Sequence, residues 1–147
     1  ASEKAQAVKA YLEDLQAMTD DKVILASDTL ISFNGQSVGK PEDKADSKRI
    51  LTMLSGKTHD VLTAICVLDN AQQQTQVITT SVTFAALTDE QIDAYWETGE
   101  PADKAGSYAI QGIGGEFVVS INGSASAVIG LPLYETRQLL NEFGVVS

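Results

Sequence analysis

The chain has few of the residues on which several classes of protein depend. Its 147 residues include one cysteine, Cys66, and one histidine, His59. Zinc sites built from Cys-Cys or Cys-His patterns are therefore impossible, and no disulfide can form within the chain. A single cysteine favours a reducing compartment, so we expect a cytoplasmic protein in which Cys66 is a small buried hydrophobic residue.

Basic residues are also scarce. Lys and Arg together number 10 against 20 Asp and Glu, which gives a formal net charge of −10. This balance argues against a general nucleic-acid binder, because neutralising phosphates requires clustered cations. It does not exclude a nucleotide enzyme, in which a few local cations and a metal hold a triphosphate.

The apolar runs are far too short for a membrane span, and no signal peptide is visible, so we expect no membrane partner. The chain starts with Ala1 inside a segment with a helical pattern, and we expect the natural N-terminus to lie upstream. Two catalytic signatures are absent as well. The chain has no Gly-x-Ser-x-Gly elbow, and residues 35–40 lack the Gly-Lys-Ser/Thr ending of a phosphate loop. A Ser-His-Asp triad would have to use His59, and little supports it.

The hydrophobic periodicity predicts one α/β domain over residues 1–147, with a mixed sheet that contains antiparallel hairpins and is flanked by helices. Asn34-Gly35 is a strong hairpin signal and places Asp28 inside a hairpin or at its lip. A capping box at 88–91 predicts the start of a helix that ends before Gly99. The other predicted helices are 2–18, 43–56 and 133–143, and the predicted strands are 23–33, 59–69, 75–87 and 116–121.

The segment DKAGSYAIQGIGG (103–115) contains four glycines mixed with apolar residues. This composition predicts a loop packed on the protein, with its backbone held close to a neighbour. The loop carries Asp103, Lys104 and Gln111, and further candidate residues elsewhere are Asp28, Lys40 and Lys57. Together they would suit a metal-assisted nucleotide phosphohydrolase, in which a carboxylate binds Mg²⁺ or takes a proton and lysines neutralise phosphates.

Each candidate also has a simpler interpretation from the residues alone. Asp28 could cap a turn, and Lys40 and Lys57 could be ordinary solvated lysines. Asp103 and Lys104 could form a surface ion pair of little energetic weight. Gln111 is harder to dismiss, because an amide among apolar residues needs hydrogen-bond partners.

At these same positions the chain resembles the Maf family of nucleotide pyrophosphatases, whose fold is similar to that of inosine triphosphatases. The resemblance covers essentially the whole chain, with Ser27 where the family usually has Ala. The pairing of DKAGSYAIQG with a later GLPL is highly specific. The matching segments are EKA (3–5), ASDT (26–29), GKP (39–41), LSGKTHDVLTA (54–64), GEPADKAGSYAIQG (99–112) and INGSASAVIGLPL (121–133).

The resemblance implies hydrolysis of a nucleoside triphosphate to the monophosphate and pyrophosphate, with a divalent metal, Mg²⁺ or Mn²⁺. It assigns Asp28 as proton acceptor and metal ligand, and it places Lys4 and Lys40 at the phosphates. Thr29 and Gln111 would select the base. Lys104 would be a further phosphate contact.

The resemblance also suggests why the loop is rich in glycine. Gly106 and Gly112 would allow the backbone to approach the nucleotide, while Tyr108 and Ile110 anchor the loop to the core. The pairing of Asp-Thr with Ile-Gln-Gly resembles the branch of the family that hydrolyses dTTP and UTP. Modified pyrimidine nucleotides are further candidate substrates. The resemblance thus implies a role in cleaning the nucleotide pool. A carboxamide can meet the O4/N3–H edge of thymine or uracil.

One departure from the family pattern affects activity. The chain lacks the family's N-terminal Ser-x-Ser-Pro-Arg-Arg loop and the metal-binding Glu that follows it, and its arginines are Arg49 and Arg137. We therefore expect an N-terminally truncated family member. A catalytically impaired nucleotide-binding or regulatory domain linked to cell division is the alternative function. A protein-interaction domain has less support. The family implies a homodimer, for which residues 59–87 could supply an interface.

Overall fold

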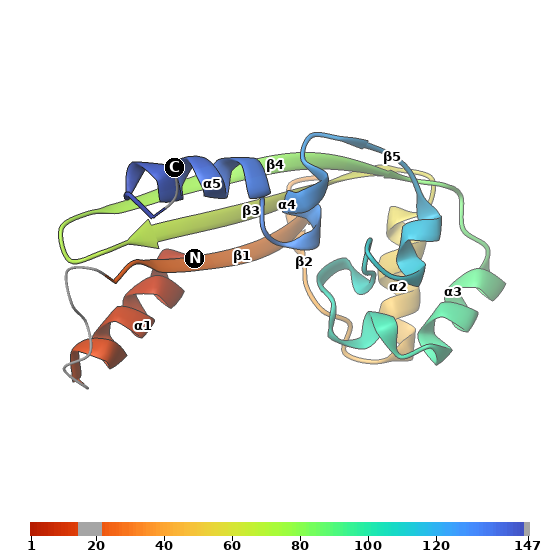
Figure 1. Ribbon diagram of the computed structural model, residues 1–147. Helices are drawn as coiled ribbons and strands as arrows, with labels where there is room; N and C mark the ends of the chain where they lie inside the picture. The colour runs from red at the N-terminus through yellow and green to blue at the C-terminus, as the bar shows by residue number, and fades with distance from the viewer. Residues whose placement is uncertain (15–21, 146–147) are drawn as a thin grey trace.

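The computed structural model describes residues 1–14 and 22–145 (Figure 1). A five-stranded sheet has the order β2-β1-β3-β4-β5. Its strands are β1 (Ile24–Phe33), β2 (Gln36–Val38), β3 (Thr58–Leu68), β4 (Gln73–Phe84) and β5 (Val118–Asn122). The helices are α1 (Ser2–Asp14), α2 (Lys44–Leu54), α3 (Asp89–Glu97), α4 (Ala125–Ile129) and α5 (Leu133–Glu142). None of the helices in these described ranges has the length and apolar content needed to cross a membrane.

The predicted α/β class and the antiparallel hairpins are confirmed. Neighbouring strands pair antiparallel throughout the described sheet, so the parallel pairs that a mixed sheet would also contain do not occur in it. Asn34 and Gly35 form the predicted β1–β2 turn, with φ of 51° and 78°. Positive φ at both central residues is typical of the tight turns that match strand twist. Asp28 lies within β1, well before this turn.

The two faces of the sheet carry different helices. Cys66 and Leu68 of β3 pack with α1, while Ile65 and Val67 pack with residues of α5. Successive side chains of a strand point to opposite faces, so α1 and α5 cover opposite sides of the sheet. Cys66 is fully buried, as expected from the sequence. Figure 1 shows α2 and α3 grouped at the other end of the sheet. Buried residues of both helices belong to one large hydrophobic cluster.

Several predicted boundaries differ from the structure. The helix predicted over 2–18 is α1, described as far as Asp14, and residues 15–18 lie outside the described residues. The strand predicted over 75–87 ends at Phe84, because the next backbone groups bond to other segments: the Ala85 N–H donates to the Phe117 carbonyl, and the Leu87 N–H donates to the Ser55 hydroxyl. The strand predicted from 116 begins only at Val118, after the 3₁₀ turn of η3 (Ile113–Phe117).

The short helix α4 was missed by the sequence analysis. Ser124 caps it, since the Ser124 hydroxyl accepts a hydrogen bond from the Ala127 N–H at 3.1 Å. The predicted capping box at α3 is confirmed, because Thr88 and Gln91 each accept a hydrogen bond from the other's backbone N–H. Tyr95 of α3 belongs to the core, whereas Trp96 is only partly buried.

Candidate active site

A cavity of about 330 Å³ lies where β1 meets α1, α4 and the glycine-rich loop. Six of the residues to which the family resemblance assigns a catalytic or substrate-binding role line it: Lys4, Asp28, Thr29, Lys40, Lys104 and Gln111. These residues come from segments spread over more than a hundred positions of the chain. Gly106 and Gly112 do not line the cavity. Lys57 also lies outside it, exposed and 5.9 Å from the Phe33 ring centroid, as its simpler interpretation expected.

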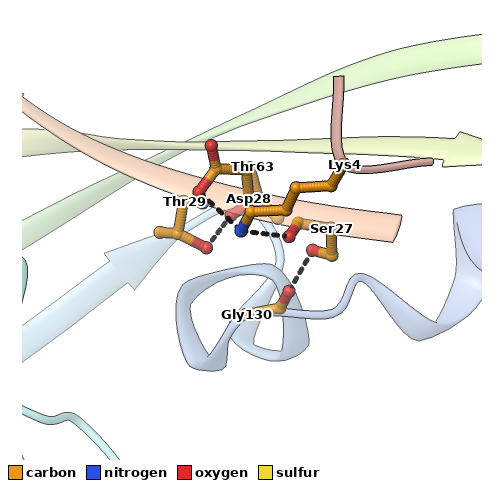
Figure 2. Close-up of polar contacts among 6 residues, drawn as sticks. All are labelled: Lys4, Ser27, Asp28, Thr29, Thr63 and Gly130. Atoms are coloured by element: carbon orange, nitrogen blue, oxygen red, sulfur yellow. Dashed lines mark hydrogen bonds and ion pairs between the residues drawn. The ribbon is translucent and has the colours of Figure 1, made fainter. Parts of the chain in front are cut away.

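Asp28 occupies an open position on the cavity wall. Within the described sheet, β2 pairs only with the last three residues of β1, so residues 24–30 of β1 form an edge. Lys4 reaches this edge from α1: its Nζ lies 3.3 Å from Asp28 Oδ1 and donates a hydrogen bond to the Ser27 carbonyl at 3.2 Å (Figure 2). Both side chains are 59% exposed. Exposed ion pairs contribute little to stability. Breaking the Lys4–Asp28 pair so that Lys4 binds phosphate or Asp28 binds a metal would therefore cost little free energy.

Hydroxyls of β1 and β3 fasten α4 and its C-cap Gly130 to the sheet (Figure 2). The Ser27 hydroxyl donates to the Gly130 carbonyl, and the Thr63 hydroxyl donates to the Ala127 carbonyl at 2.6 Å. Thr29 Oγ1 lies 3.5 Å from Thr63 Oγ1. Because the single Thr63 proton is used toward Ala127, Thr29 is the donor in that long contact. Thr63 was not predicted from the sequence, because nothing local distinguishes it from other strand threonines.

The glycine-rich loop is fixed to the segment after β2 that carries Lys40. The Gly106 N–H donates to the Gly39 carbonyl at 3.1 Å, and the buried hydroxyls of Ser47 and Ser107 are hydrogen-bonded. A Cβ on Gly106, which has φ of 73°, would lie 2.5 Å from Cδ1 of Ile31. The close approach seen at this glycine is therefore to the core. The approach to a nucleotide stays a prediction.

The lysines of the cavity differ in their partners. The predicted pair of Lys104 and Asp103 is present, with Nζ 3.3 Å from Oδ1, and both residues line the cavity. Lys40 makes no hydrogen bond or ion pair within the described part of the chain. An unpaired ammonium facing the cavity is ready to meet an anion without first leaving a carboxylate.

Tyr108 and His59 form a neutral support beneath the cavity. Tyr108 lines the cavity, is buried as predicted, and its hydroxyl lies 2.6 Å from His59 Nε2. Burial lowers the pKa of His59 to about 4 and raises the pKa of Tyr108 above its usual range, so both are uncharged near neutral pH. His59 Nδ1 has no hydrogen-bond partner among the described residues. This geometry supports a structural role for His59, and gives no catalytic triad.

The carboxylates of the cavity suit a metal that arrives with phosphate. The described residues contain no group of three or more His, Cys, Asp or Glu side chains placed to hold an ion. Asp28 and Asp103 nevertheless both line the cavity. Mg²⁺ is commonly held by one or two carboxylates together with substrate phosphates and waters, so this donor set fits a substrate-bound divalent ion.

Known proteins are similar to this chain over nearly its whole length. The model of the family described as Maf-like protein matches residues 1–143. The chain belongs to the Maf family. A dTTP/UTP pyrophosphatase of Colwellia psychrerythraea is 53% identical over 147 residues, which are all of this chain and 68% of that relative. A second, from Vibrio parahaemolyticus, is 51% identical over 141 residues, covering 96% of this chain and 71% of the relative. A third, from Shewanella oneidensis, is 48% identical over 146 residues, covering 99% and 73%.

Family membership confirms the resemblance stated from the sequence motifs.

Proposed function

We propose that this chain is a dTTP/UTP pyrophosphatase that releases the nucleoside monophosphate and pyrophosphate. The observation that carries the proposal is the gathering of Lys4, Asp28, Lys40, Lys104 and Gln111 around one cavity. Cations, a carboxylate and an amide are the groups needed to bind a triphosphate, accept a proton and read a base. The names of the Maf relatives support the same substrates.

The phosphate end of the substrate would lie against the lysines. Lys40 would bind phosphate oxygens directly, and Lys4 and Lys104 would turn to them from their carboxylate partners. Asp28 would orient a water and take its proton as the water oxygen bonds to the α-phosphorus, next to the oxygen that bridges the α- and β-phosphates. The bridging bond then breaks, and pyrophosphate leaves with the electron pair. A divalent metal held by Asp28 and the phosphates would supply charge neutralisation during this step.

The base would lie against Gln111 and Thr29. The Gln111 carboxamide can donate to O4 and accept from N3–H of thymine or uracil, and the Thr29 hydroxyl offers a further polar contact. This edge is reversed in cytosine, which has a donor at position 4 and an acceptor at N3. Modified pyrimidine triphosphates with the same edge are candidate substrates. Removing them from the nucleotide pool would be a cytoplasmic role, and we propose a homodimer as the assembled form.

Pyrophosphate release from the 147-residue chain tests this function. The assay uses Mg²⁺ or Mn²⁺ with dTTP, UTP, CTP, dATP, GTP and 7-methyl-GTP. We expect release from dTTP and UTP, and little from the others. If none of the six nucleotides gives pyrophosphate but dTTP raises the Tm, the results would instead support a binding domain without turnover.

Lys40→Met should lower kcat/KM for dTTP by about 10- to 100-fold, because a hydrogen bond to a charged group contributes about 1.5–3 kcal/mol. The effect should appear mainly in KM, since Lys40 would hold phosphate both before and during the reaction. Lys57→Met is the matched control, as it removes an exposed lysine outside the cavity. Equal rates for the two variants would remove Lys40 from the phosphate site.

A further inference from the structure

A carboxylate lies under the part of the glycine-rich loop that carries Gln111. Glu100 does not line the cavity, but its Oε1 accepts a hydrogen bond from the Ile113 N–H at 2.9 Å. Its Oε2 accepts one from the Gly114 N–H, also at 2.9 Å, and another from the Tyr95 hydroxyl. Three donors thus converge on a single carboxylate.

Tyr95 extends this network to the other end of the same loop. Its hydroxyl accepts a hydrogen bond from the Ala109 N–H at 3.1 Å while it donates to Glu100. The chain is therefore fixed at Ala109 through Tyr95 and at Ile113 and Gly114 through Glu100. Three residues lie between these anchors, and two of them, Ile110 and Gln111, line the cavity together with Ala109.

The glycines of this segment are explained by the carboxylate. A Cβ on Gly112 would lie 1.8 Å from Glu100 Oε1, and a Cβ on Gly114 would lie 2.6 Å from the Tyr95 hydroxyl. Real Cβ atoms do not approach other atoms so closely, so the chain can wrap this pair only with glycine at both positions. At Gly112, the role that the structure supports is this contact with Glu100, and its predicted contact with substrate stays untested.

The network is suited to remain charged and ordered near neutral pH. Burial raises the pKa of Glu100, but the hydrogen bonds from Tyr95, Gly114 and Ile113, together with the charge of Lys104, outweigh it and hold the pKa below its usual range. Tyr95 keeps its proton because burial and the Glu100 hydrogen bond raise its pKa.

We propose that Glu100 is a positioning residue for base selection: it holds Ile110 and Gln111 in register with the cavity, so that the Gln111 amide meets a pyrimidine edge. The Gln111 side chain makes no hydrogen bond or ion pair of its own within the described residues. Its placement therefore depends on the backbone that Glu100 and Tyr95 fix. This inference rests on the proposed function and deepens it, because it names what determines the base.

Glu100→Gln tests the proposal with almost no change in size. A carboxamide replaces one acceptor oxygen by an NH₂ group, which cannot accept the hydrogen bond offered to that side. We expect KM for dTTP and UTP to rise roughly 10-fold or more and the preference for UTP over CTP to fall by a similar factor, because small misplacements of a binding group are expensive. The inhibition constant of inorganic tripolyphosphate, which has no base, should stay within about twofold, because Lys4, Lys40 and Lys104 are all retained and none of them forms an ion pair with Glu100. Glu97→Gln, a neighbouring exposed carboxylate paired with Lys44, is the control and should change none of these values.

A merely structural role would give a different pattern. It would weaken tripolyphosphate and nucleotide together and leave the UTP-to-CTP ratio intact, and that result overturns the proposal. An unchanged ratio with unchanged KM overturns it as well. A double-mutant cycle with Gln111→Ala adds an independent test. If Glu100 acts through Gln111, the double variant should lose no more base preference than Gln111→Ala alone, whereas additive losses contradict the mechanism.

Two further measurements keep the proposal separate from the enzyme activity. If Glu100→Gln does not fold, Tyr95→Phe removes one hydroxyl from the network, and it should lower the UTP-to-CTP preference in the same direction. If the wild-type chain binds nucleotides without hydrolysing them, the same preference is read as the difference in Tm shift between UTP and CTP. Glu100→Gln should abolish that difference. Absence of turnover in the wild-type chain would thus contradict the proposed function. An unchanged difference between the UTP and CTP Tm shifts in Glu100→Gln would contradict the role of Glu100.

Discussion

Asp28→Asn should lower kcat for dTTP hydrolysis by about 10²–10⁴-fold, the usual contribution of a positioned general base. Asparagine keeps the size of the side chain but cannot take a proton from water. The fold should be almost unaffected, because the Asp28 side chain is 59% exposed and its ion pair with Lys4 is open to solvent. Pyrophosphate release at saturating dTTP measures the first expectation, and thermal unfolding measures the second.

Asp60→Asn provides the matched control for this experiment. Asp60 is an exposed strand carboxylate on neighbouring β3, where it accepts a hydrogen bond from Ser81 at 2.9 Å, and it does not line the cavity. Its replacement should leave kcat within about twofold, as is usual for exposed positions outside a site. If Asp28→Asn retains the wild-type kcat, proton transfer to Asp28 is not part of the reaction, and the cavity must activate water differently.

Local signals in the sequence were enough to predict most of the framework. The Asn34-Gly35 turn, the capping box at Thr88 and the alternating strands each depend on neighbours a few residues away, and each is confirmed. The gathering of Lys4, Asp28 and Gln111 on one cavity could not be derived from spacing. It was expected only because the motifs resemble a family, and the structure brings these residues together.

The contacts that sequence reasoning missed are long-range hydrogen bonds. Thr63 donates to a carbonyl 64 positions later, and Glu100 binds backbone N–H groups 13 and 14 positions later. Neither residue has a local pattern that distinguishes it from an ordinary strand threonine or surface glutamate. The one available signal was the spacing of glycines at 112 and 114, which marked a close approach without showing that its target was Glu100.

The second large effect concerns stability in acid, and it arises from His59. This residue is 2% exposed and contacts the rings of Phe84 and Tyr108, and burial lowers its pKa from 6.5 to about 4 despite the opposing charge of Asp60. Between these two pH values the unfolded chain binds a proton that the folded chain does not. Stability contributed by neutral His59 is therefore complete above about pH 6.5 and is lost as the pH falls toward 4, by on the order of 3 kcal/mol in total.

Urea unfolding at several pH values between 7 and 4, on wild type and His59→Phe, isolates this contribution. Phenylalanine should lower stability at pH 7, because it leaves the buried Tyr108 hydroxyl without its partner. It should also make the free energy of unfolding fall less steeply with acid, because carboxylates titrate in both proteins and His59 only in wild type. His59 is the only histidine of the chain, so its NMR titration can be followed directly. Parallel stability curves, together with a His59 midpoint near 6.5, would show that the ring is solvated and charged in the folded protein and would contradict its role as a neutral support beneath the cavity.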